Sequence, residues 1–421
     1  MLERIKQEAI QGKTLLKFVT LKAAGETLGM LAPLIIAKFF SRSLFGSYSL
    51  AKMVVFLFVA VLISSTQAPF VVYAGKELNN TGKINKTFTI QCVFLAVSLI
   101  VFLAIVLAFN SFIMSFAQVS RANLFFMYLA FAGVSFKTFL SNTFLAMDQK
   151  IRHSLVELIF GICGVLLVIV FRFVNWINIT SVFLVYFLAT IFVIISFARY
   201  VEYSKLFPLD WDQKYFIDNL NFSKWVVLGS SCAYFINWGD NLVLRYFVTM
   251  DDIGIYNFAY QIFKGIIMLT FGLVYYFMPL VSRNIGDKQR MNAYIFSKRP
   301  KAFLLGLAPI CILFIFAPCA VRMVYEGVYD DSIAVLRILL VGAALTLYSA
   351  FYVPILHVLE RYRFSQGMDA VQAIVNLVLD VILVPRMGIY GAAVATVIAY
   401  CCRTVIFEIY FRKRIIKLFA V

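Results

Sequence analysis

Long apolar runs separated by short charged stretches constrain this chain more than any other feature of the sequence. A helix that crosses a bilayer needs roughly 20 consecutive apolar residues. Twelve such runs can be marked in the 421 residues, 62% of which are hydrophobic. The runs are continuous rather than alternating, which excludes the strand pattern of a membrane β-barrel. The sequence therefore predicts an all-α polytopic membrane protein with twelve transmembrane helices and excludes a water-soluble enzyme.

The predicted spans follow the apolar runs between charged breaks. The separation between the fifth and sixth spans is the weakest, and Arg172, Asn175, Trp176 and Asn178 supply its turn. The spans cover approximately residues 15–40, 47–73, 87–109, 122–147, 155–174, 178–199, 223–247, 254–281, 302–321, 332–357, 365–385 and 389–411.

Lys and Arg are distributed unequally between the two sets of loops. The termini and the loops after even-numbered spans hold 25 of them, whereas the opposite loops hold at most seven. Because Lys and Arg collect in cytoplasmic loops, we expect both termini to be cytoplasmic. The same rule accounts for the net charge of +17 without a nucleic-acid partner, and we expect none.

The two halves of the chain resemble each other. The second span opens with Gly46-Ser-Tyr-Ser-Leu-Ala51, and the eighth opens with Gly254-Ile-Tyr-Asn-Phe-Ala259. Six spans in each half give both halves the same orientation, as in parallel repeats related by an axis along the membrane normal. We therefore expect two pseudo-symmetric six-helix lobes around a central cleft, residues 1–205 and 223–421, joined by a cytoplasmic linker at 206–222.

Charged residues within the spans are candidates for function, because each costs about 2.5–3.5 kcal/mol near mid-bilayer. By helical rise, Lys264, Lys137 and Arg403 lie too deep to reach the headgroups. Lys52 is shallower and can snorkel to the interface. Cations outnumber anions in the spans, which favours an anionic substrate such as a phosphate group. The alternative is that carboxylates or helix ends cancel these charges, and the sequence leaves it open.

Lys22 and Glu26 are four residues apart on the first span, and therefore lie on one helix face. They either form a local ion pair that lowers the cost of insertion, or they face the cleft. In the second case Glu26, like Asp240 on the seventh span, is a candidate for coupling to a proton or cation gradient. Gly25 and Gly29 permit close packing of the same helix.

Signatures of other classes are missing from the sequence. Gly12-Lys13-Thr14 resembles the end of a phosphate-binding loop, but the first glycine of that motif is replaced by Gln7. The seven cysteines lie within apolar runs without zinc-ligand spacing, so we expect no disulfide and no metal site. We expect a transporter, not an enzyme, with no cofactor other than an ion gradient of H⁺ or Na⁺.

The segment from Asn376 to Thr396, NLVLDVILVPRMGIYGAAVAT, resembles the signature of spans eleven and twelve in the polysaccharide exporter and lipid-linked oligosaccharide flippase family. Asp251–Ala259 and Gly46–Tyr48 resemble its entries to spans eight and two. The family belongs to a superfamily that also holds multidrug extruders and lipid II flippases. Together with the span count, the resemblance covers nearly the whole chain.

The resemblance implies an alternating-access flippase of the bacterial inner membrane. Its substrate would be an undecaprenyl-pyrophosphate-linked oligosaccharide, such as an O-antigen repeat unit. Basic residues on spans one, two and eight line a cationic cavity in relatives, which implies Lys22, Lys52 and Lys264 here, with Lys137 and Arg403 in support. A monomer is expected, working in the membrane lipid with the polymerase and chain-length proteins of its pathway.

Three rival functions remain open at this stage. A multidrug extruder of the same superfamily would favour an acidic cleft, which the deep cations argue against. A polysaccharide polymerase or ligase would need a sizeable outer loop, and the predicted outer loops are short. A passive channel or scaffold would not need two repeated lobes.

Overall fold

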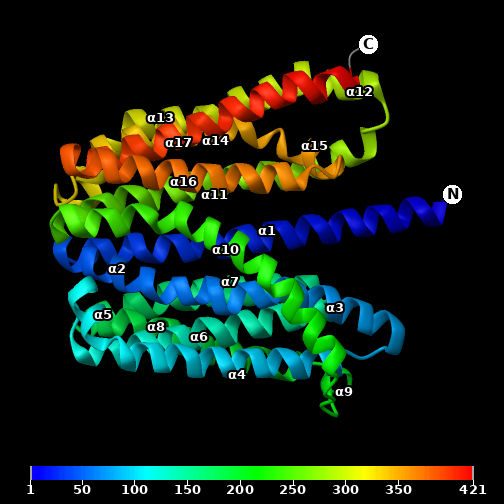
Figure 1. Cartoon of the computed structure of the whole chain (residues 1–421), viewed down its shortest axis with the longest axis horizontal. Coiled ribbons are helices and arrows are strands. Elements are labelled where there is room, and N and C mark those ends of the chain that lie inside the picture. The colour runs from blue at the N-terminus through cyan, green and yellow to red at the C-terminus, as the bar shows by residue number, and fades with distance from the viewer. Residues whose placement is uncertain (1, 420–421) are drawn as a thin grey trace. The chain divides into compact units, whose positions relative to one another are not determined.

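The computed structural model describes the backbone of residues 2–419. Side chains are described in that range except at positions 2–16, 19, 271–273, 275, 276, 279 and 362. Within the described chain every regular element is helical, and the helices follow one another as twelve long units joined by short turns (Figure 1). The prediction of an all-α chain of twelve spans is therefore confirmed.

The first six units extend from the N-terminus to the middle of the chain. They are α1 (Leu2–Phe39), α2 with η1 and α3 (Arg42–Phe58, Val59–Ser64 and Ser65–Thr81), α4 (Asn85–Ala108), which is followed by the short α5 (Asn110–Ala117), α6 (Arg121–Ala146), α7 (Lys150–Phe173) and α8 (Ile179–Phe197). Two short elements, η2 (Ala198–Tyr200) and α9 (Tyr203–Leu206), lead to the second half.

The second six units complete the chain. They are α10 (Gln213–Phe247), α11 (Met250–Asn284), α12 with η3 and α13 (Lys288–Ala293, Tyr294–Lys298 and Arg299–Tyr325), α14 with α15 (Ser332–Ala350 and Val353–Val358), α16 (Tyr362–Met387), and α17 with η4 and α18 (Ile389–Tyr410, Phe411–Ile415 and Ile416–Phe419). Among the described residues, ten of the twelve units are long and apolar enough to cross a membrane. The protein is thus a multi-pass membrane protein.

Glycines with positive φ and a capping side chain set the ends of several helices. Gly82 ends α3 with φ of +72°, and Gly388 separates α16 from α17 with φ of +57°, a region that favours glycine. Asn178 caps α8, because its side-chain oxygen accepts a hydrogen bond from the Ser181 backbone N–H at 2.9 Å. The turn predicted between Arg172 and Asn178 is therefore confirmed.

Two compact units make up the structure. Unit 1 comprises Met1–Phe40 and Ser47–Ser231, and unit 2 comprises Ser41–Gly46 and Cys232–Val421. The division falls inside α10, within the predicted seventh span. We expected residues 206–222 to form a linker. The first turns of α10 lie within this segment, so only the residues before Gln213 connect the helices.

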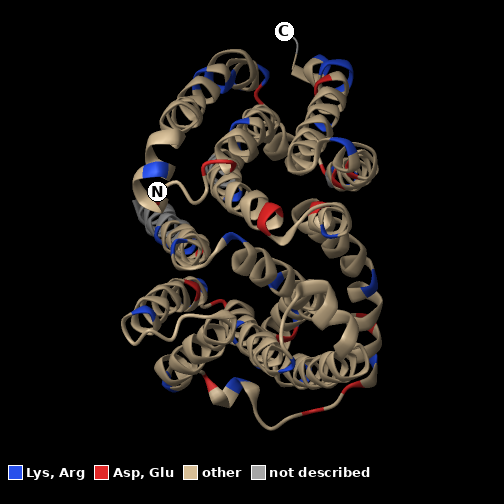
Figure 2. Ribbon diagram, turned by 90° about the vertical axis from the view of Figure 1, so that its left-hand side faces the viewer, with Lys and Arg blue, Asp and Glu red and all other residues tan. Residues whose placement is uncertain are grey.

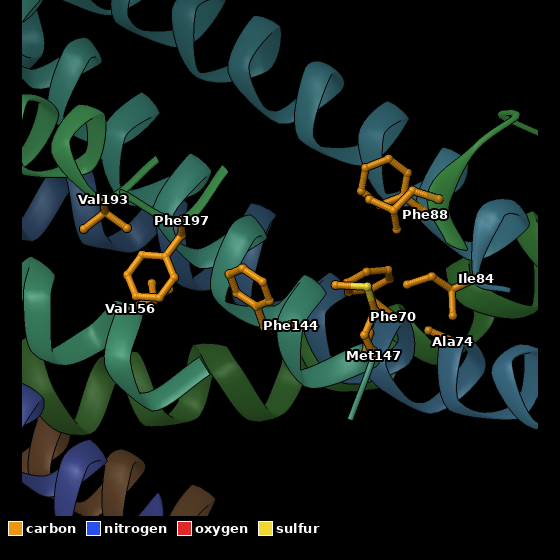
Figure 3. Close-up of a cluster of buried hydrophobic side chains, with 11 residues drawn as sticks. Phe70, Ala74, Ile84, Phe88, Phe144, Met147, Val156, Val193 and Phe197 are labelled. Atoms are coloured by element: carbon orange, nitrogen blue, oxygen red, sulfur yellow. The ribbon is translucent and has the colours of Figure 1, made fainter. Parts of the chain in front are cut away.

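A cluster of eleven buried apolar residues forms the core at one end of unit 1 (Figure 3). Its members come from α3, α4, α6, α7, α8 and α9 and the turns beside them: Phe70, Ala74, Ile84, Phe88, Phe144, Ala146, Met147, Val156, Val193, Phe197 and Leu206. Burial of apolar surface holds these helix ends together. Because Leu206 belongs to the cluster, the segment after α8 is packed onto unit 1.

The first turn of α2 packs against α11 through direct backbone contact within unit 2. A Cβ atom on Gly46 would overlap the carbonyl oxygen of Met250, and one on Gly254 would overlap that of Arg42. These two glycines are the corresponding residues of the predicted repeat. Arg42 also donates from Nη1 to Asp331 at 2.8 Å, which ties the same turn to the segment before α14.

Candidate functional site

Charged residues are few along the helices of both units (Figure 2). In unit 1 the relevant ones lie where α1 packs on α7. A Cβ atom on Gly25 would lie 2.7 Å from the Leu158 backbone nitrogen, and one on Gly161 would lie 2.9 Å from the Gly25 carbonyl oxygen. The close approach therefore uses Gly25 and Gly161, whereas a Cβ on Gly29 would meet nothing within 4 Å. This contact brings α1 beside the acidic residue of α7, Glu157.

Lys137 on α6 forms an ion pair with Glu157. Its Nζ atom donates to both carboxylate oxygens at 2.9 and 2.8 Å, and the two side chains are 12% and 22% exposed. Ser141 donates to the same carboxylate at 3.2 Å, and its hydroxyl lies 2.9 Å from Nδ1 of His153. The sequence left open whether a carboxylate cancels the charge of this lysine. The structure places such a carboxylate, that of Glu157, at ion-pair distance from it.

Lys22 and Glu26 lie on α1 beside this pair. Lys22 is half-buried and Glu26 is exposed. The charges of Lys22, Glu157 and Lys137 all act on the Glu26 carboxyl, so the four residues form one electrostatic group. The group holds two cations and two anions, and its net charge is zero when all four are ionised. Lys22 and Glu26 therefore belong to a group whose ionised charges sum to zero.

Lys52 on α2 has aromatic neighbours. Its Nζ atom lies 5.8 Å from the ring centre of Tyr48 and 5.5 Å from that of Phe56, and the side chain is half-buried. Such geometry stabilises an ammonium group through the negative face of the rings.

Lys264 on α11 has a similar environment in unit 2. Its Nζ atom lies 4.0 Å from the ring centre of Trp238 and 4.8 Å from that of Tyr260. Tyr260 precedes Lys264 by four residues, just as Tyr48 precedes Lys52 on α2. Each half therefore holds a membrane lysine against the ring of a tyrosine one helical turn earlier.

Arg403 on α17 is paired, like Lys137. Its Nη2 atom lies 2.8 Å from a carboxylate oxygen of Asp369 on α16, and its guanidinium stacks on Phe407 at 5.1 Å. Its Nε atom is buried with no hydrogen-bond partner among the described residues. The carboxylate partner whose existence the sequence left open is therefore Asp369.

Two buried carboxyl groups meet in unit 2. Asp240 on α10 is 2% exposed and Asp380 on α16 is 0% exposed. The Asn376 amide bridges them, since it donates to Asp240 and, at 3.2 Å, to Asp380. The Tyr256 hydroxyl also donates to Asp240, as does the Thr396 hydroxyl at 3.1 Å. Oδ1 of Asp380 and Oδ1 of Asn376 are buried without a hydrogen-bond partner in the described chain.

This acidic cluster suits a small cation or a proton. Two adjacent buried carboxylates cannot both stay ionised without a compensating positive charge. The neighbouring amide and hydroxyl oxygens are the ligand type that hard cations take. The sequence pointed to Asp240 but missed its partners. The spacing of Asn376 and Asp380, four residues apart inside an apolar span, was the signal that could have found them.

Comparison with known proteins places the chain in a family. The family described as "Polysaccharide biosynthesis protein" matches residues 16–285, which is more than half of the sequence. The chain belongs to this family. This assignment confirms the family resemblance that the sequence showed.

Two curated relatives of this polysaccharide biosynthesis protein match part of its length. The probable low-salt glycan biosynthesis flippase Agl15 of Haloferax volcanii is 24% identical over 188 residues, which are 44% of this chain and 40% of the relative. The uncharacterized membrane protein MJ1068 of Methanocaldococcus jannaschii is 23% identical over 249 residues, 55% of this chain and 47% of that protein. The match thus spans about half the length of each relative.

Solved structures share the fold of this family member over nearly all of the chain. The lipid II flippase MurJ in an inward closed conformation has a TM-score of 0.76 at 14% identity, with 96% of this chain and 88% of the other covered. An inward-facing multidrug resistance MATE transporter of the MOP superfamily has a TM-score of 0.77 at 13% identity, covering 96% and 98%. The fold is that of this superfamily, with twelve helices in two lobes.

Proposed function

We propose that this protein is a flippase that moves an undecaprenyl-pyrophosphate-linked oligosaccharide, such as an O-antigen repeat unit, from the inner to the outer leaflet of a bacterial inner membrane. Membership of a polysaccharide biosynthesis family carries the proposal, because it points to a glycan cargo on a transporter fold. The relative named as a glycan biosynthesis flippase also supports a glycan cargo. Alternating access of the two units is the mechanism that this fold favours.

In this proposal Lys52 and Lys264 are the principal ligands of the pyrophosphate. Each is a membrane lysine whose ammonium group is positioned by aromatic rings of its own unit. A phosphate oxygen can form charge-assisted hydrogen bonds with them. Lys22 is a further ligand when Glu26 takes up a proton. Lys137 and Arg403 act through their carboxylate partners and would position the site rather than bind the substrate.

Sugar rings and the lipid carrier need different surroundings from the diphosphate. The aromatic faces of Tyr48, Phe56, Trp238 and Tyr260 beside the lysines favour stacking with apolar faces of sugar rings. The polyprenyl tail stays in the hydrocarbon of the membrane. The substitution of either lysine by alanine would therefore remove the phosphate contact and leave the sugar and lipid contacts in place.

The test is flipping of a labelled undecaprenyl-pyrophosphate sugar in proteoliposomes. We expect Lys52→Ala and Lys264→Ala each to lower the initial rate roughly ten- to hundredfold, which corresponds to the loss of one hydrogen bond to a charged group. Arg337→Ala is the matched control, because Arg337 is a membrane cation stacked on Phe314 at 5.3 Å that has no part in the proposal. Full activity in both lysine variants would refute the proposed site.

Ion coupling is the second part of the proposal, and it rests on the acidic cluster of Asp240 and Asp380. A proton or Na⁺ bound there would reduce the negative charge of the pair from two to one in one state of the transport cycle and leave in the other. We expect Asp240→Asn and Asp380→Asn to flip at one rate whether or not a gradient is applied. The exposed Asp251 gives the control Asp251→Asn, which should keep the gradient dependence. Gradient-driven flipping in the Asp240 variant would contradict the assignment.

A further inference from the structure

One end of unit 2 carries a dense group of basic residues, here called the terminal basic patch. It is built from two segments, residues 283–301 and 408–417, which are distant in sequence and come together because α12 packs against α18 near the C-terminus (Figure 1). The patch contains ten basic residues: Arg283, Lys288, Arg290, Lys298, Arg299, Lys301, Arg412, Lys413, Arg414 and Lys417. The same segments contain only two acidic residues, Asp287 and Glu408.

Both acidic residues are already engaged by members of the patch. Asp287 lies 3.1 Å from Nε of Arg290, and Glu408 lies 2.5 Å from Nε of Arg412 and 3.8 Å from Nη2 of Arg299. The side chains of Arg290 and Arg412 are nevertheless 72% and 70% exposed. The patch therefore keeps a large excess of accessible positive charge after its internal ion pairs are counted.

The C-terminal segment of the patch is amphipathic. Phe411, Ile415 and Phe419, at four-residue spacing, are buried against unit 2, while the four cations between them are exposed. Apolar side chains also stay exposed beside the charges: Phe296 is 61% and Leu418 is 51% exposed. Exposed apolar groups next to Lys and Arg are typical of segments that lie at the membrane interface.

Two lysines of unit 1 are paired with carboxylates of the same unit. Lys86 contacts Asp212 at 2.9 Å and Asp210 at 3.9 Å, and Lys205 contacts Glu202 at 2.7 Å. The general preference of Lys and Arg for cytoplasmic loops accounts for the sign of the charge in both units. It does not account for the concentration of the excess on one end of unit 2.

We infer that the terminal basic patch binds the phosphate headgroups of anionic phospholipids in the leaflet at that end of the molecule. A phospholipid fits the surface because α13 and α17 continue from the patch as membrane-spanning helices, which keeps the cations at headgroup level. The exposed Phe296 and Leu418 can contact the acyl chains. This lipid site uses none of the residues of the proposed transport site, and it does not depend on the proposed function.

The experiment measures lipid binding by the full chain purified in neutral micelles. Phosphatidylglycerol is titrated against phosphatidylcholine, and bound lipid and the unfolding temperature are recorded. In the variant R412Q/K413Q/R414Q/K417Q we expect the affinity for phosphatidylglycerol to fall roughly tenfold or more, since each cation near the surface contributes to the attraction. The matched control is K76Q/K83Q/K150Q/K214Q, which removes four exposed cations from unit 1 and should change the affinity less than about twofold.

Further arms separate the possible outcomes. Equal weakening in both quadruple variants would overturn the inference, because only net charge would then matter. Binding of a short-chain prenyl diphosphate at the patch without binding of phosphatidylglycerol would overturn it as well, since the surface would then belong to the transported substrate. The charge-conserving variant R412K/R414K keeps the test valid if the glutamine variant does not fold, and it should retain binding. Loss of phosphatidylglycerol binding in that variant would refute a simple headgroup attraction.

Discussion

Lys137 and Glu157 form a two-point ion pair inside helices that cross the membrane. A buried pair of this kind gives little net stability relative to apolar residues, because desolvation offsets the attraction. Removal of one partner is different, since it leaves an unpaired charge in a medium of low dielectric constant. The pair therefore constrains which substitutions unit 1 tolerates, whether or not it takes part in transport.

We expect Lys137→Met to lower the free energy of unfolding by about 3–5 kcal/mol, because Glu157 is then buried without its counter-charge. The double variant Lys137→Met with Glu157→Met should regain most of that loss. Unfolding in mixed detergent micelles measures both. Equal destabilisation by the single and double variants would show that the contact matters through packing, not charge.

The sequence predicted which residues of the site carry charge but not which of them meet. Lys137 and Glu157 are 20 residues apart on consecutive helices, and nothing in their spacing sets the rotation of one helix against the other. Uniformly apolar spans have almost no amphipathic face from which that rotation could be read. Such rotations are set by close packing that the sequence does not display, such as the contact of Gly25 on α1 with Gly161 on α7. The pairing of Arg403 with Asp369 was hidden for the same reason.

At the scale of elements, the contact between α2 and α11 depends on two glycines at corresponding places in the repeat. A methyl group at either position would collide with a main-chain carbonyl oxygen, which cannot move aside as a flexible side chain can. The contact fixes the first turn of α2 to unit 2, while the rest of α2 belongs to unit 1. A substitution at either glycine therefore acts on α2, whose residues belong partly to unit 1 and partly to unit 2.

We expect Gly46→Ala and Gly254→Ala each to destabilise the protein by about 1–3 kcal/mol, the usual cost of overpacking. Gly164→Ala on α7 is the control, because a Cβ atom there would meet nothing within 4 Å. That substitution should be neutral or stabilise by up to about 1 kcal/mol, as alanine favours the helix. Thermal unfolding in detergent measures all three. A harmless Gly254→Ala would contradict the close contact.

The number and order of the helices could be predicted because bilayer thickness and apolar runs set them directly. Their lengths could not, since several helices continue past the apolar run into water. The second predicted span ended at residue 73, for example, while α3 continues to Thr81 and ends at Gly82. Helical hydrogen bonding favours such extension wherever no glycine or proline interrupts it. Only the breaks caused by special residues, such as Gly388, were visible in the sequence.

At the scale of the whole molecule, the segment between α8 and α10 joins the two halves and is bound firmly to unit 1. The Ile84 backbone N–H donates to the Lys205 carbonyl at 3.0 Å, and the Asn85 amide donates to the Pro208 carbonyl at 3.1 Å. Burial of Leu206 in the apolar cluster adds to these bonds. The sequence predicted a cytoplasmic linker, and it did not reveal that the linker is docked.

Charge contacts at both ends of this segment make its docking sensitive to acid. A hydrogen bond from Lys86 holds the pKa of Asp212 below its usual value of 3.8, and a hydrogen bond from Lys205 does the same to the pKa of Glu202, usually 4.5. A carboxyl whose pKa is lower in the folded state stabilises that state above its unfolded pKa. This contribution is lost as the pH falls through the folded pKa.

We therefore expect the linker to stay docked near pH 7 and to loosen progressively as the pH is lowered from about 5 to 3. Trp211 lies in the linker with its ring 5.2 Å from that of Phe216, so its fluorescence reports the change once the signal of a Trp211→Phe variant is subtracted. Lys86→Met should move the transition to higher pH, because the Asp212 carboxyl then titrates nearer its usual value. The control Lys83→Met removes an exposed lysine outside these contacts and should leave the transition in place. If Lys86→Met leaves the transition unmoved, the Lys86–Asp212 contact does not hold the linker.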